Sequence, residues 1–175
     1  MNVRNTIALA ACGAAVMFFT GCSGPVKVTG GGKAIGEAWD LTLGGGYYEN
    51  VTATAAGQVQ LTELNDGDSY DGTGNFQFVD HVTGMCFHAD LVVGGGLPDA
   101  EGYVWIFGFV RDCGSEDGLF DDGIVDLWLY DSGMQGPDKG DGVYVARYDA
   151  DDNLIYVFAG ELTSGNYKIH KVKTK

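Results

Sequence analysis

The sequence predicts an all-β domain that folds as a single antiparallel β-barrel of about 8–10 strands, with a β-sandwich as the alternative. Many short segments alternate apolar and polar residues with the period of two that is typical of a half-buried strand. Turn signals rich in Gly, Asp and Asn separate these segments about every 8–12 residues. No stretch after residue 27 keeps a helical period over about ten residues.

The first part of the domain predicts three strands separated by glycines. Trp39 and Leu41 alternate with polar neighbours, and the next segment is rich in Tyr, Val and Thr, which pleated sheets favour. We interpret the triple glycines at 30–32 and 44–46 as bends or bulges near strand ends. The expected strands are 33–43, 47–55 and 57–64.

The segment 74–91 predicts a β-hairpin at the centre of the domain. Phe76 and Phe78 alternate with polar residues before the loop. Asp80 favours the start of a turn and Gly84 tolerates a positive φ angle. After the loop, the apolar positions are Met85, Phe87, Ala89 and Leu91. We therefore expect one buried face on both arms of the hairpin.

An aromatic strand is expected over 100–111. Its one face carries Tyr103, Trp105, Phe107 and Phe109, while the other carries Val104, Ile106 and Val110. With both faces apolar, the strand is expected to be central. Two interpretations of the aromatic residues, together with Trp128, stay open: they line a cavity for an apolar ligand, or they form packed core. The remaining expected strands are 123–130, 142–149, 154–162 and 165–172.

The N-terminal segment has the features of a secretion signal. Arg4 precedes an uncharged apolar run over 7–19, and a glycine followed by Cys22 ends it. The segment resembles a bacterial lipoprotein signal, which implies that Cys22 carries lipid and becomes the mature N-terminus. The alternative is an ordinary cleaved signal peptide with an incidental cysteine.

The lipoprotein interpretation divides the chain into a signal peptide (1–21), a tether (22–27) and the β domain (28–175). It predicts an exported protein held in the cell envelope through lipid on Cys22. Ser23, in place of an Asp, favours the outer membrane of a Gram-negative cell.

The charge of the chain excludes one class of partner. The formal net charge is −14, and removal of residues 1–21 takes away Arg4 alone among the charged residues, which leaves −15. Nucleic-acid binding requires a basic footprint, so we expect no nucleic-acid partner. A protein or glycan partner is compatible with this charge, but the sequence identifies neither.

Two of the four cysteines remain as candidates for a disulfide. Cys12 lies in the signal segment and Cys22 is the lipidation candidate, which leaves Cys86 and Cys113. In an exported domain such a pair can form a disulfide that stabilises by about 3–4 kcal/mol. The alternative is two buried thiols on separate strands.

Four short motifs resemble a family of small exported bacterial all-β domains of uncharacterised function. They are VTGGG at 28–32, DHVTGM with FH at 80–88, DSG leading to an Asp at 131–141, and SGNYKIHK at 164–171. The family loop runs Asp-x-Gly-Glu-Pro-Gly, whereas this chain has Met134 to Pro137 in place of Glu-Pro-Gly. The resemblance implies an exported β module and supplies no catalytic residues.

Acidic loops are the candidates for a metal site. Calcium is coordinated by carboxylate and carbonyl oxygens, which loops rich in Asp and Gly can provide. Turn chemistry is the alternative explanation of the same Asp-Gly pairs. The favoured candidate ligands are Asp131, Asp138 and Asp141, and a second set is Asp66, Asp68 and Asp71.

Catalytic residues are not identified by any motif. His81, His88 and His170 have no recognised metal-ligand spacing, and no serine lies in a Gly-x-Ser-x-Gly context. The sequence therefore favours a non-catalytic envelope lipoprotein that binds a ligand or surface with calcium as a candidate cofactor. The alternatives are a carrier of a small apolar ligand in a barrel cavity and an unrecognised enzyme.

Overall fold

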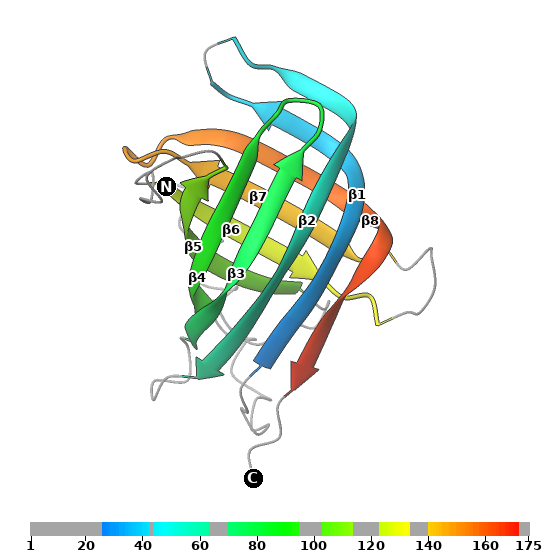
Figure 1. The fold of residues 1–175 in the computed structure, drawn as a ribbon, viewed down its shortest axis with the longest axis vertical. Coiled ribbons are helices and arrows are strands. Elements are labelled where there is room, and N and C mark those ends of the chain that lie inside the picture. The colour runs from blue at the N-terminus through cyan, green and yellow to red at the C-terminus, as the bar shows by residue number, and fades with distance from the viewer. Residues whose placement is uncertain are drawn as a thin grey trace, which may run out of the picture.

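The chain folds into a closed eight-stranded antiparallel β-barrel, as the computed structural model shows (Figure 1). The structure describes residues 26–42, 44–63, 70–94, 103–113, 123–133 and 140–171. The predicted fold class is confirmed, and the barrel rather than the sandwich is correct. Among these residues no helix is long and apolar enough to cross a membrane.

Each strand pairs with its neighbour along the chain, and the last strand pairs with the first. The strands are β1 (Val26–Asp40), β2 (Tyr47–Glu63), β3 (Tyr70–Asp80), β4 (Cys86–Gly94), β5 (Tyr103–Asp112), β6 (Gly123–Tyr130), β7 (Gly142–Tyr148) and β8 (Leu154–Lys171).

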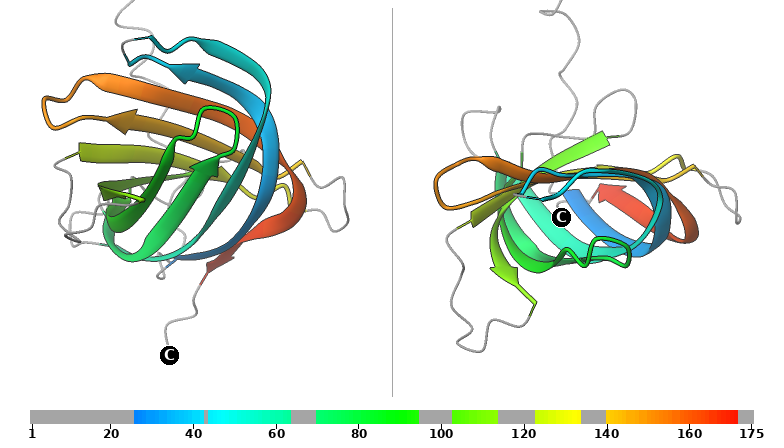
Figure 2. Two further views of the ribbon diagram at one scale, coloured as in Figure 1. Left: turned by 45° about the horizontal axis from the view of Figure 1, so that its top comes forward. Right: turned by 90° about the horizontal axis from the view of Figure 1, so that it is seen from above.

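Strands β1 and β8 close the barrel, and β1 is paired along its whole length. Their pairing runs from Val26 opposite Lys171 to Asp40 opposite Tyr156. Figure 2 shows the two strands curving together around one side of the barrel. The start of β1 and the end of β8 therefore lie side by side at one end of the barrel.

The eight strands lie within the predicted number, but three of them are longer than the segments expected from the sequence. β2 joins the expected strands 47–55 and 57–64, and β8 joins 154–162 and 165–172. β1 begins at Val26, inside the predicted tether, and runs through the glycines at 30–32. Glycine did not end these strands because the neighbouring strands supply a continuous hydrogen-bond ladder on both sides.

The glycines of β1 and β8 are required by close backbone contact at a sharp bend. Gly30 and Gly31 have φ angles of 130° and 136°, and Gly165 has 86°. A Cβ atom on Gly31 would lie 2.2 Å from the carbonyl oxygen of Ala55, and one on Gly165 would lie 2.1 Å from that of Gly31. A register shift between Lys33 and Ala34 lies next to this bend. These glycines allow β1 and β8 to curve enough to close the barrel.

The expected central hairpin is β3 and β4. Phe78 pairs with Phe87, and both are fully buried. The carboxylate of Asp80 accepts hydrogen bonds from the backbone N–H groups of Val82 and Thr83 and from the hydroxyl of Thr83. Gly84 has a φ angle of 85°, as the turn prediction requires. The hairpin prediction is thus confirmed.

Candidate binding site

The interior of the barrel is filled by apolar side chains. The ring of Phe78 contacts three other buried rings, with centroids 5.4 Å from Phe87, 5.9 Å from Tyr156 and 5.3 Å from Phe158. The largest fully buried side chains are Tyr156, Tyr167, Phe76, Phe78, Phe87 and Phe158. An eight-stranded barrel has an interior just wide enough for its own side chains to fill, and this one follows that rule.

The aromatic residues of β5 lie on the outside of the barrel, so both earlier interpretations of them were wrong. Val104, Ile106 and Val110 are fully buried in the interior. Tyr103 is 40% exposed and Phe109 is 48% exposed on the opposite face of the same strand. Since adjacent side chains of a strand point to opposite sides, the aromatic residues cannot line the interior.

Cross-strand pairing extends this aromatic surface over β5, β6, β7, β8 and β1. The first row is Tyr103, Tyr130, Gly142, Glu161 and Ile35. The second row is Trp105, Trp128, Tyr144, Ala159 and Glu37. The third row is Phe107, Asp126, Ala146, Val157 and Trp39. We call these fifteen residues the outer aromatic face; they include all three tryptophans of the chain.

An open groove of about 670 Å³ lies in the first two rows. Gly142, Ala159 and Gly160 contribute small or absent side chains, whereas the neighbouring positions carry rings. The ring side chains that line the groove are Tyr103, Trp128, Tyr130 and Tyr144. The groove is therefore formed by two small outward residues on β7 and β8 beside large residues on β5 and β6.

The rings around the groove are held by one another. Tyr103 and Tyr130 stack with centroids 4.7 Å apart and an angle of 28° between their planes. Trp128 and Tyr144 meet edge to face at 80°, with centroids 5.0 Å apart. Such contacts limit rotation of the side chains, so the groove presents ring faces and edges in fixed directions.

Three carboxylates lie on the outer aromatic face. Glu161 lines the groove, and Glu37 lies opposite Ala159 of its floor. Asp126 accepts a hydrogen bond of 3.1 Å from the indole N–H of Trp105. Burial among the rings raises the pKa of Asp126, while this hydrogen bond opposes the change. Burial also raises the pKa of Tyr148, with contributions from Asp126 and Tyr144.

Basic side chains are absent from the three rows of the outer aromatic face, all of which lie in the described part of the chain. An aromatic surface with three carboxylates and no cation has a negative electrostatic potential. This face therefore attracts cations and repels anions.

Strands β2, β3 and β4 lie on the other side of the barrel from β6 and β7 (Figure 1). Polar residues are concentrated on their outer surface. Gln77 pairs with His88, which in turn pairs with Arg111. A second open groove of about 620 Å³ follows this surface, and its polar lining residues are Thr29, Gln58, Asn75, Gln77, His88, Asp90 and Arg111. We call these seven residues the polar face.

The two described acids of the favoured calcium set serve as hydrogen-bond acceptors for the backbone. Asp141 is fully buried and accepts from the N–H of Tyr167 (2.9 Å) and from the N–H and hydroxyl of Ser132 (3.0 and 2.9 Å). Asp131 accepts from the N–H groups of Gly133 (2.8 Å) and Ile169 (2.9 Å). Because β7 is much shorter than β8, these carboxylates complete the ladder of β8 where β7 does not reach it.

The rest of the metal prediction falls mostly outside the described residues. Asp66, Asp68 and Asp138 lie there, while Asp71 is an exposed residue of β3. Within the described ranges, no group of three His, Cys, Asp or Glu side chains is arranged to hold a metal ion. Calcium binding thus stays a prediction.

The three histidines are not brought together. His88 is on β4 and His170 on β8, which are not neighbouring strands. His81 lies in the turn after β3, where its Nε2 is 2.9 Å from the hydroxyl oxygen of Thr54 on β2. The three histidines therefore lie at separate places on the barrel.

A buried polar pair fixes the hairpin turn to the interior. The hydroxyl of Tyr156 on β8 donates a 2.8 Å hydrogen bond to Asp80. Burial, together with this carboxylate, raises the pKa of Tyr156. The phenol therefore stays protonated and acts as a structural donor.

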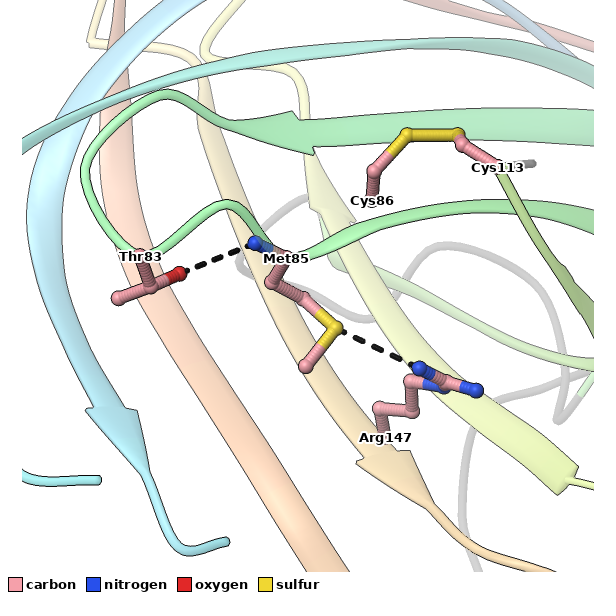
Figure 3. The surroundings of a disulfide bond; sticks show 5 residues. All are labelled: Thr83, Met85, Cys86, Cys113 and Arg147. Carbon is pink, nitrogen blue, oxygen red and sulfur yellow. Dashed lines mark hydrogen bonds between the residues drawn. A yellow bond between two sulfur atoms is a disulfide. The ribbon is translucent and has the colours of Figure 1, made fainter. Parts of the chain in front are cut away.

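The predicted pairing of Cys86 and Cys113 is confirmed. The two residues form a disulfide with Cα atoms 5.4 Å apart, joining the start of β4 to the end of β5 (Figure 3). Met85, next to Cys86, accepts a hydrogen bond of 3.4 Å at its sulfur from the guanidinium of Arg147. Cys22 and the signal segment lie outside the described residues.

Comparison with protein-family models, curated proteins and solved structures finds no match.

Proposed function

We propose that this chain is an exported, lipid-anchored protein of the bacterial cell envelope whose barrel binds a ligand on its outer surface without catalysis. The observation that carries the proposal is the groove in the outer aromatic face. Exposed apolar surfaces of this kind mark interaction sites. Its small-residue floor also gives the surface a shape into which a ligand can fit.

The position of the binding site supports surface binding over the cavity carrier. The aromatic residues that would have lined a cavity face outward, and the interior is occupied by rings such as Phe78 and Phe158. A ligand of useful size would need to displace several of these close-packed side chains. The groove offers its rings without any such displacement.

The proposal also includes a lipid anchor on Cys22. Lipid on Cys22 would lie four residues before β1, at the barrel end where β1 and β8 pair. A short link of this kind would hold that end of the barrel near the membrane and leave the sides of the barrel free. Replacement of Cys22 by Ala should move the protein from the membrane fraction to the soluble fraction, whereas Cys12→Ala should leave it in place. Unchanged fractionation of the Cys22 variant would contradict the anchor.

Calcium assistance is a further part of the proposal. It requires Asp138, or another loop acid outside the described residues, to complete a site near Asp131 and Asp141. Melting of the protein with millimolar calcium and with a chelator tests it. The proposal requires a higher melting temperature with calcium, and identical curves would remove calcium from it.

A paired substitution tests the surface-binding proposal. We would screen the full chain by tryptophan fluorescence against sugars, amines, amino acids and fatty acids, because all three tryptophans lie on the proposed surface. Gly142→Leu should abolish binding, since a side chain here fills the groove floor. The matched control, Gln58→Leu on the polar face, should bind normally. Ligands that bind both variants equally, or that are chemically converted, would overturn the proposal.

A further inference from the structure

We propose that the groove in the outer aromatic face binds a small organic cation with a quaternary ammonium group, such as choline. This inference rests on the proposed function, because it names the ligand class for the same groove. It follows from the size of the groove, the chemistry of its walls and the signs of the charges around it.

The size of the groove favours a small molecule. Small-ligand sites occupy about 300–1,000 Å³, and this groove has about 670 Å³. Its floor is Gly142 and Ala159, so a compact group can approach the sheet closely. A folded protein partner would instead need a much wider contact surface.

The walls of the groove provide what a quaternary ammonium group requires. Such a group has no N–H bonds to donate, so it binds through the electron-rich faces of aromatic rings. Trp128 and Tyr144 lie at 80° to one another, and Tyr103 and Tyr130 form a second ring pair beside them. The rings therefore surround the groove from more than one direction.

The charges around the groove select for a positive ligand. Glu161 lies in the groove lining, and Glu37 is directly across from Ala159 on the neighbouring strand. Opposite residues of neighbouring antiparallel strands lie about 5 Å apart. Two carboxylates thus flank the floor, and no Lys, Arg or His side chain occurs among the described residues that line the groove. An anionic ligand would be repelled.

The absence of amide and basic groups among these lining residues disfavours a sugar. Sugars present many hydroxyl groups, which need donors and acceptors when they lose water. Such side chains are concentrated instead on the polar face, at Gln58, Asn75, Gln77 and Asp90. A free cation is favoured over a lipid headgroup because a phosphate would approach Glu161 and Glu37.

The first experiment compares choline with its neutral isostere, 3,3-dimethyl-1-butanol, by calorimetry and tryptophan fluorescence on the full chain. The two molecules have nearly the same shape and differ in charge. We expect choline to bind about 10-fold more tightly, since cation–π attraction and the carboxylates act on choline alone. Equal affinities would overturn the inference.

Variants locate the binding and test its electrostatic part. Glu161→Gln should weaken choline binding by about 5-fold and leave the weak binding of the isostere unchanged. Asp90→Asn, a matched change on the polar face, should have no effect. Gly142→Leu and, independently, Ala159→Leu should abolish choline binding. Melting curves show whether each variant folds. If only one of Gly142→Leu and Ala159→Leu folds, that variant alone locates the binding site.

The outcomes separate this inference from the proposed function. If a neutral or anionic ligand from the screen binds in a manner that depends on Gly142 while choline does not bind, the cation inference fails and the surface-binding proposal stands. If choline binds Gly142→Leu and Ala159→Leu normally, the site is elsewhere and this assignment fails. Binding to phosphatidylcholine vesicles without binding to free choline would also overturn it.

Discussion

The polar face over β2, β3 and β4 and the outer aromatic face over β5 to β8 and β1 are built on the same barrel, yet their compositions are opposite. The interior side chains are similar in both halves: Phe78 and Phe87 in one, Ile106 and Leu127 in the other, all fully buried. Outside, the polar face carries amides, His88 and Arg111, whereas the aromatic face carries rings and carboxylates. Close packing explains why the interior residues are apolar, but it does not explain why aromatic rings are exposed on the outside of one half. The difference therefore supports the proposal that the outer aromatic face binds a ligand.

The largest expected effect comes from interior side chains, in either half. Phe78→Ala on β3 should lower the free energy of unfolding by about 3–5 kcal/mol, and Ile106→Ala on β5 should lower it by about 2–5 kcal/mol. In both variants the lost side chain leaves a cavity. Urea denaturation measures both. A small effect in one half alone would show that the two halves do not share a uniformly packed interior.

The disulfide joins the two halves at β4 and β5, and its removal should have the next largest effect. Replacement of Cys86 and Cys113 by Ser should lower the free energy of unfolding by about 3 kcal/mol, because the unfolded chain gains freedom. Urea denaturation of the wild-type protein with and without reductant provides an independent measurement of the same loss of stability. If reduction has no effect on the wild type, the disulfide contributes no stability.

Removal of an exposed ring should separate binding from stability. Tyr144→Thr takes away one wall of the groove and the contact with Trp128, and Thr is well suited to a strand. We expect a loss of about 1 kcal/mol in stability, together with loss of groove binding. Gln77→Thr, on the polar face, should alter neither. A loss of stability as large as that of Ile106→Ala would mean that Tyr144 is structural.

The smallest effect concerns the pH dependence of Asp126. Its pKa is raised in the folded protein, so the folded state holds this proton more tightly than the unfolded state. Stability should therefore fall as the pH rises from the ordinary aspartate value of 3.8 through the raised value, and stay lower above it. Asp126→Asn retains an acceptor for Trp105 and should melt slightly higher at neutral pH, with no advantage below the ordinary value.

Asp90→Asn on the exposed part of the polar face is the control for this pH experiment. It should show no comparable pH-dependent gain. An Asp126 variant whose advantage persists at low pH would indicate a cause other than the buried charge.

Local patterns predicted much of the fold. The alternation around Phe76 and Phe78, with Asp80 and Gly84 between the arms, identified the hairpin because a tight turn and a one-sided strand are both local. The exclusion of Cys12 and Cys22 identified the disulfide. The continuity of β1 and β8 through glycines could not be predicted, because it depends on neighbouring strands far away in the sequence.

The candidate site was harder to predict than the fold. β5 is apolar on both faces, so its sequence does not tell which set points inward. Neighbouring strands decide this, since the interior has room for Val104 and Ile106 but the rings would compete there with Phe78 and Phe158. The groove floor at Gly142 and Ala159 had no local signal at all. Only the register of β6, β7 and β8 brings these small residues beside Trp128 and Tyr130.

The pairing of β1 with β8 has a consequence for how the chain acquires its structure. The longest seam of the barrel joins residues as far apart as Val26 and Lys171, so it cannot form until the last strand is available. Contacts of such large sequence separation make folding slow. Until closure, β1 presents an open edge to other chains. The barrel therefore closes late in folding, and β1 stays unpaired on that side until β8 has joined it.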